Sequence, residues 1–118
     1  MTQEDKELLL KDLCSRLPYG VICYNSSTES NFRLFDVTDA DSDYPAFDYG
    51  YGELETVKPY LRPMSSMTEE ENEEYIKRNL YGFHWDFVDW CNSKHLDYRG
   101  LIPKGLAIEV TKDNNPYK

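Results

Sequence analysis

The sequence predicts one α+β domain spanning residues 1–118, and three observations carry that prediction. Apolar residues at helical spacing open the chain, and short β-branched and aromatic runs separated by polar turns follow them. Near the middle of the chain, proline and capping signals mark a change from extended to helical structure. We therefore expect an N-terminal helix, a small mostly antiparallel sheet or open barrel, two further helices and a C-terminal strand.

The first helix is predicted over residues 2–17. Thr2 is a suitable N-cap residue, and acidic residues follow it in the first turn, where the helix dipole favours them. The predicted apolar stripe consists of Leu10, Leu13, Cys14 and Leu17, and Leu9 widens it. Pro18 and Gly20 end the helix. We expect the stripe to pack on the core of the domain, and the alternative is that it docks a partner.

Four strands are predicted, over residues 21–24, 32–37, 54–61 and 105–110. The first three form either a small antiparallel sheet or an open barrel, and a barrel would be the better way to hide strand edges in so small a domain. The tail at residues 113–118 is expected to fray.

The change from strand to helix is encoded around two prolines. Pro59 and Pro63 remove two backbone donors, so neither a helix nor a central strand can run through them. Thr68 and Glu71 then have capping-box spacing, which predicts a helix over residues 69–80.

The second and third helices each have a narrow apolar side. On the second helix this side consists of Tyr75, Ile76 and Leu80. The third helix is predicted over residues 83–94, with Phe87, Val88, Trp90 and Cys91 facing inward.

The charge of the chain limits its partners. It has 22 acidic and 13 basic side chains, for a net charge of −9. Because phosphate binding needs a basic face, free nucleic acid is a poor partner, whereas a basic protein surface is a good one. The sequence lacks a run of 18 apolar residues, so we expect no membrane span. The N-terminal stretch is acidic and has no apolar signal-peptide core, which predicts a cytoplasmic protein.

The cysteines and histidines are few and scattered. We expect Cys14, Cys23 and Cys91 to be reduced, mostly buried thiols that form no disulfide. They lack the CxxC spacing of metal ligands, and neither Cys14 nor Cys23 lies in the basic surroundings that activate a catalytic thiol. His84, Cys91 and His95 could share one helical region, so a small metal-dependent enzyme is an alternative. The favoured interpretation is structural, because a helix C-terminus suits His95 as a cation or as a carbonyl-bonded imidazole. No cofactor or metal is expected.

An acidic, tyrosine-rich segment at residues 36–55 is the most distinctive part of the surface. It contains seven acidic residues and no Lys or Arg. The predicted partner-binding residues are Asp39, Asp41, Asp43, Tyr44, Tyr49 and Tyr51. The alternatives are a merely solvated loop and a calcium loop, but Tyr44 and Gly50 stand where an EF-hand loop requires Gly and Glu.

Two long stretches are specific enough to compare with a family: KPYLRPMSSMTEEE (residues 58–71) and DWCNSKHLDYRGLIPKGLAIE (residues 89–109). Both resemble an uncharacterised family of small acidic proteins from gut Bacteroidetes bacteria and their phage-like mobile elements. Residues 7–21, ELLLKDLCSRLPYGV, are similar to the opening of the same family. In that family a second histidine often precedes the position of His95, where this chain has Lys94, which argues against a histidine-pair metal site. The acidic tyrosine-rich segment departs from the family pattern, and the resemblance implies no activity.

The leading hypothesis is a non-enzymatic interaction or accessory protein of a bacterial mobile element that binds a basic protein surface. One alternative is an acidic nucleic-acid mimic that inhibits a basic protein, which the net charge of −9 permits. The other is the small metal-dependent enzyme. The sequence leaves the partner and the oligomeric state open.

Overall fold

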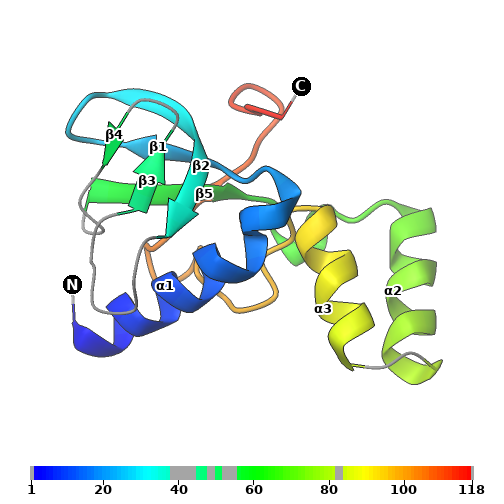
Figure 1. Cartoon of the computed structure of the whole chain (residues 1–118). Coiled ribbons are helices and arrows are strands. Elements are labelled where there is room, and N and C mark those ends of the chain that lie inside the picture. The colour runs from blue at the N-terminus through cyan, green and yellow to red at the C-terminus, as the bar shows by residue number, and fades with distance from the viewer. Residues whose placement is uncertain (1, 38–44, 48–49, 52–55, 82–83, 118) are drawn as a thin grey trace.

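The computed structural model describes residues 2–37, 45–47, 50–51, 56–81 and 84–117 (Figure 1). The described part is a small α+β fold with an open sheet, and its N-terminal helix comes first, as predicted. The helices are α1 (Gln3–Arg16), α2 (Glu69–Tyr81) and α3 (His84–Ser93). None of the helices in this part of the chain is long and apolar enough to cross a membrane.

The strands form an open, mixed sheet. In chain order they are β1 (Ile22–Asn25), β2 (Ser30–Val37), β3 (Pro45–Phe47), β4 (Gly50–Tyr51), β5 (Val57–Leu61) and β6 (Ile108–Glu109). Across the sheet the order is β4-β3-β2-β1-β5-β6, and all neighbours are antiparallel except β5 and β6, which are parallel. The described strands therefore form an open sheet and not the barrel that the sequence allowed, and β6 is shorter than predicted.

The buried face of α1 differs from the predicted one. The helix begins as predicted, because the Thr2 hydroxyl oxygen accepts a hydrogen bond from the Asp5 backbone N–H at 3.1 Å. Its buried residues are Leu9, Asp12, Leu13 and Arg16. Of the predicted stripe, Leu9 and Leu13 are fully buried and Leu10 and Leu17 are partly buried, but Cys14 is exposed instead of buried. The buried face also contains Asp12 and Arg16, which the pattern of apolar residues did not predict and which can be buried because they form an ion pair with one another.

The hydrophobic core lies between α1, the sheet and the turns that follow α3 (Figure 1). Its buried members are Leu9, Leu13, Val21, Cys23, Leu34, Val57, Leu61, Leu101, Leu106 and Ala107. Leu106 and Ala107 precede β6, so they reach the core from a turn and not from the predicted strand. Burying one leucine side chain contributes about 1.5–3 kcal/mol, so Leu9 and Leu13 help to hold α1 on the sheet.

The C-terminal segment packs against the sheet. The predicted fraying of residues 113–118 is therefore wrong for the part that the structure describes, which ends at residue 117. The Tyr117 hydroxyl accepts a hydrogen bond from the Ile22 N–H at 3.1 Å and donates to the Tyr60 carbonyl oxygen at 2.7 Å. Its ring stacks on His95, with centroids 3.7 Å apart. Burial raises the pKa of Tyr117 above its usual value. The tail thus bridges β1 and β5.

The predicted capping box starts α2. The Glu71 N–H donates to the Thr68 hydroxyl at 3.2 Å, and the Thr68 N–H donates to the Glu71 carboxylate at 3.0 Å. The same carboxylate accepts hydrogen bonds from Arg62, which directly follows β5. The Arg62 backbone N–H in turn donates to the His95 carbonyl oxygen at 2.7 Å. Arg62 therefore joins the end of β5 to the start of α2 and to the turn after α3.

The apolar side of α2 faces α3 only in part. Tyr75 meets Phe87 edge to face, with ring centroids 5.2 Å apart. Ile76 and Leu80 are 49 % and 67 % exposed, so the predicted apolar side is wrong at these two residues. The reason is the position of α2, which lies on the outer side of α3, away from the sheet (Figure 1).

Candidate functional site

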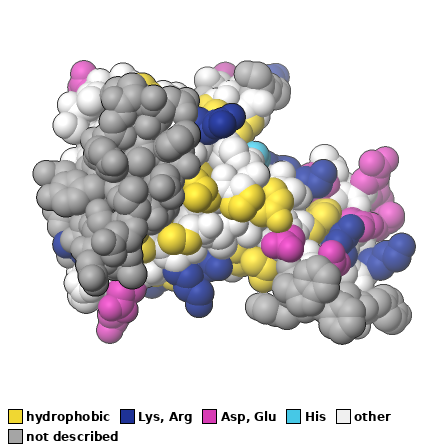
Figure 2. Space-filling model, viewed as in Figure 1, with side chains coloured by type: hydrophobic (Ala, Val, Ile, Leu, Met, Phe, Trp, Pro, Cys, Tyr) yellow, Lys and Arg dark blue, Asp and Glu magenta, His cyan; other side chains and the backbone are white. Residues whose placement is uncertain are grey.

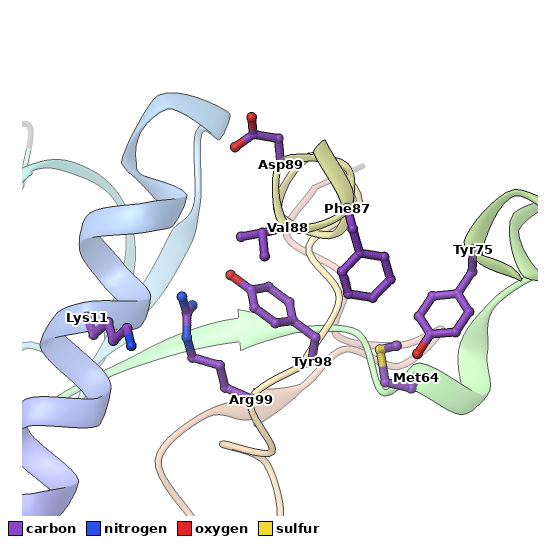
Figure 3. A pocket seen from close by; sticks show the side chains of 8 residues that line it. All are labelled: Lys11, Met64, Tyr75, Phe87, Val88, Asp89, Tyr98 and Arg99. Atoms are coloured by element: carbon purple, nitrogen blue, oxygen red, sulfur yellow. The ribbon is translucent and has the colours of Figure 1, made fainter. Parts of the chain in front are cut away.

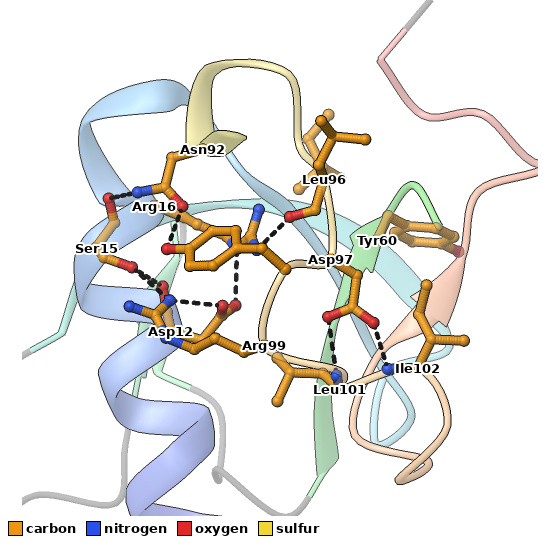
Figure 4. Close-up of polar contacts among 12 residues, drawn as sticks. Asp12, Ser15, Arg16, Tyr60, Asn92, Leu96, Asp97, Arg99, Leu101 and Ile102 are labelled. Atoms are coloured by element: carbon orange, nitrogen blue, oxygen red, sulfur yellow. Dashed lines mark hydrogen bonds and ion pairs between the residues drawn. The ribbon is translucent and has the colours of Figure 1, made fainter. Parts of the chain in front are cut away.

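A buried charged network joins α1 to the turn that follows α3. Asp12 and Arg16 are fully buried, and Arg16 Nε donates to the Asp12 carboxylate at 2.8 Å. Arg16 Nη2 donates to the Leu96 carbonyl oxygen at 2.6 Å (Figure 4). Arg99 Nη1 donates to the other Asp12 carboxylate oxygen at 2.9 Å. One carboxylate therefore serves two guanidinium groups, which leaves this trio with an excess of one positive charge.

Further polar contacts hold Tyr98 and Arg99 in place. Arg99 Nη1 also donates to the Ser15 hydroxyl at 3.0 Å, and the Ser15 carbonyl oxygen accepts from Asn92 Nδ2 at 3.2 Å. The Tyr98 hydroxyl donates to Asn92 Oδ1 at 2.9 Å. The Tyr98 ring lies 5.1 Å from Arg16 Cζ and 4.6 Å from Arg99 Cζ, within the range of cation–π attraction. Both residues are thus positioned by the folded chain alone.

Asp97 fixes the turn that carries these two residues. Its two carboxylate oxygens accept hydrogen bonds from the Leu101 and Ile102 backbone N–H groups at 2.8 and 2.9 Å. Because the carboxylate is buried, these charge-assisted bonds hold the start of the turn firmly.

The end of α3 directs the chain into this turn. The Leu96 N–H donates to the Cys91 carbonyl oxygen and the His95 N–H to the Asn92 carbonyl oxygen, each at 3.0 Å, which is a Schellman motif. His95 occupies the left-handed position of the motif, with φ of 58°, where glycine is most common.

A groove of about 690 Å³ lies between α1, the α2–α3 pair and the turn at residues 97–99 (Figure 3). Lys11 and Arg99 form its α1 side, and Tyr98 lies between that side and the apolar one. The apolar side consists of Met64, Tyr75, Phe87 and Val88. This volume and this mixture of apolar and charged walls are typical of ligand-binding sites.

The two cations of the groove have uncommitted donors. Lys11 is exposed and makes no hydrogen bond or ion pair within the described residues. The Arg99 side chain is 15 % exposed, and among the described residues only its Nη1 donates hydrogen bonds. Asp89 also lines the groove, and burial together with the negative charge of Asp89 raises the pKa of Tyr19.

Cys91 and His95 do not form an activated pair. Burial raises the pKa of Cys91 to about 11. Burial, together with the positive charges of Arg16 and Arg62, lowers the pKa of His95 to about 4, so of the two predicted forms at the end of α3, a cation or a carbonyl-bonded imidazole, the cation is wrong at pH 7. An activated cysteine needs the opposite, a thiolate beside a base. The side chain of His84 lies outside the described side chains, and no three His, Cys, Asp or Glu side chains among those described gather closely enough to hold a metal ion.

Most of the predicted partner-binding residues lie outside the described part of the chain: Asp39, Asp41, Asp43, Tyr44 and Tyr49. Tyr51 lies in β4, opposite Ala46 in β3. The sequence prediction missed the groove altogether. The one local signal is the DYRG stretch after α3, where an aromatic residue and an arginine follow the capping Asp97.

Comparison of the chain with protein-family models, curated proteins and solved structures finds no match. The function must therefore be argued from the chemistry of the groove.

Proposed function

We propose that this protein is a non-enzymatic interaction protein that binds a short segment of a partner polypeptide in the groove between α1, the α2–α3 pair and residues 97–99. One observation carries the proposal: a fixed cation stands opposite an apolar wall. Asp12 and Ser15 hold Arg99 through one nitrogen, and Val88 lies on the other side of the groove. An amphipathic segment would satisfy both sides at once.

The groove favours binding over catalysis. Its lining contains no cysteine, serine or histidine among the described residues, so it lacks the Ser–His or Cys–His pair of many hydrolytic sites. Its aromatic walls supply contact area at a low cost in conformational entropy. The net charge of −9 suits a partner with a basic surface, and the acidic, tyrosine-rich segment at residues 36–55 supplies a second, electrostatic contact in this proposal.

Titration of nitrogen-15-labelled protein with a pool of N-acetylated hexapeptides with free C-termini tests the proposal. We expect amide shifts around the groove, at Lys11, Val88 and Tyr98, and none at the exposed Thr111. Val88→Trp should fill the groove and abolish these shifts, whereas Ile76→Trp adds the same ring at an exposed site and should preserve them. Equal binding by the two variants, or no shifts in the wild type, would overturn the proposal.

A further inference from the structure

We infer that the groove recognises the free C-terminal carboxylate of a polypeptide whose last residue has a large apolar side chain. This inference rests on the proposed function and narrows it from a peptide segment to a chain end.

The guanidinium of Arg99 presents the donors that a carboxylate needs. Its Nη1 is engaged by Asp12 and Ser15, at 2.9 and 3.0 Å, which fixes the plane of the group. The opposite edge, formed by Nε and Nη2, makes no hydrogen bond within the described residues. That edge carries two parallel N–H donors, the arrangement that binds the two oxygens of a carboxylate. Lys11, on the same side of the groove, adds an ammonium group.

The local charge matches a monoanion. Arg16, Arg99 and Lys11 carry three positive charges, and Asp12 and Asp89 carry two negative charges. The groove and its supporting ion pairs therefore have an excess of one positive charge. The net charge of −9 repels polyanions at longer range. A carboxylate with one charge therefore fits this groove better than a phosphate does.

The apolar wall lines the same groove as the two cations, so one ligand residue can contact both. The Tyr98 ring lies between Arg99 and Phe87 (Figure 3), so a ligand that contacts both must carry an anion and an apolar group. The last residue of a polypeptide carries both on one Cα, whereas an internal residue has no carboxylate there. Hydrophobic side chains also gather in the middle of the face seen in Figure 2, with both basic and acidic side chains around them. The net charge of −9 favours a partner with basic residues before its C-terminal residue. A small carboxylic acid has no such residues, so a polypeptide is the better ligand.

The test is fluorescence anisotropy with a dye-labelled hexapeptide that ends Lys-Lys-Gly-Phe and has a free carboxylate. The same peptide with a C-terminal amide should bind about tenfold more weakly or worse, because it loses the charge-assisted pair. A version that ends in Gly should lose roughly tenfold through the missing apolar contact. Unlabelled N-acetyl-phenylalanine, used as a competitor, should bind about tenfold more weakly than the acid peptide, because it lacks the upstream lysines.

Three variants locate the effect. Lys11→Gln should weaken binding of the acid peptide several-fold and leave the amide peptide unchanged, whereas Lys112→Gln removes the same charge from an exposed site outside the groove and should change neither. Arg99→Lys keeps the charge but loses the forked edge, and should cost about tenfold. If Arg99→Lys fails to fold, the comparison of Lys11→Gln with Lys112→Gln decides the question.

Each contrary result has its own meaning. Equal affinity for acid and amide peptides overturns the carboxylate inference and leaves the peptide groove standing. Equal affinity for N-acetyl-phenylalanine overturns the polypeptide as the source of the carboxylate. Failure of every peptide to bind overturns both proposals.

Discussion

Arg62 and Glu71 form an ion pair that ties the end of β5 to the first turn of α2, and replacing Glu71 by Gln should weaken the domain. Arg62 Nη1 and Nη2 donate to the two Glu71 carboxylate oxygens at 2.8 and 2.7 Å. Hydrogen bonds from Arg62, reinforced by the Thr68 backbone N–H, lower the pKa of Glu71 to about 2 from its ordinary value of 4.5. Glu71→Gln keeps the shape of the side chain and removes its charge.

The size of the loss follows from that pKa. A carboxyl whose pKa falls from 4.5 to about 2 contributes about 3 kcal/mol to stability at neutral pH. The Arg62 and Glu71 side chains are 23 % and 16 % exposed, and glutamine keeps part of the hydrogen bonding. Solvent screening and the remaining bonds reduce the expected loss to about 1–2 kcal/mol, or roughly 3–8 °C in Tm. Arg62→Lys should cost a similar amount, because lysine cannot donate two parallel bonds.

The loss should depend on pH in one direction. Because the pKa of Glu71 is lower in the folded state than in the unfolded state, its stabilisation is complete above pH 4.5 and disappears as the pH falls toward about 2. The difference in unfolding free energy between wild type and Glu71→Gln should therefore be constant from pH 5 to pH 8 and shrink between about pH 4.5 and pH 2.

Urea denaturation followed by circular dichroism at several pH values measures this difference. Glu70→Gln is the matched control, since it removes the same charge from the same exposed helical turn without touching Arg62. We expect a loss of less than about 0.5 kcal/mol for the control. If the two variants have the same midpoints at pH 7, or if their difference persists at pH 2, the ion pair does not contribute as argued.

Three other changes test the fold. Thr68→Ala removes the N-cap acceptor of α2 and should cost about 1 kcal/mol in urea, and an unchanged midpoint would mean that the helix starts elsewhere. Tyr117→Phe removes the hydrogen-bond partner of the Ile22 N–H and of the Tyr60 carbonyl oxygen, and should lower the free energy of unfolding by about 1–3 kcal/mol. Hydrogen exchange at Ile22 should become faster, and unaltered exchange would contradict docking of the tail. Asp12→Ala leaves Arg16 buried without its counter-charge and should cost about 3–5 kcal/mol in chemical denaturation, and a loss below about 1 kcal/mol would refute the buried network.

Helix starts were predictable because their signals act within one turn. Thr2 caps α1, and Thr68 with Glu71 caps α2, as their spacing predicted. The strands β1, β2 and β5 also lie within two or three residues of the predicted ranges, since β-branched and aromatic runs between turns are a local pattern. The docked tail was not predictable, because Tyr117 finds its partners in β1 and β5.

The groove could not be predicted from spacing, since its residues come from separate parts of the chain. Lys11 lies on α1, Val88 on α3, and Tyr98 and Arg99 in a turn beyond α3. None of these segments has a motif of its own, and only the packing of α3 between α1 and α2 brings them together (Figure 1).

The sequence by itself determined the α+β class, the order of its elements and the first residues of its helices, because caps, prolines and periodic apolar residues act over a few positions. Tertiary structure decided which face of α1 is buried. Arg16 can leave water only because Asp12 neutralises it and the Leu96 carbonyl oxygen, 80 residues further along the chain, accepts its hydrogen bond. Arg99 then shares the same carboxylate, so the groove gains its fixed cation from a contact between residues 87 positions apart, which no local pattern encodes.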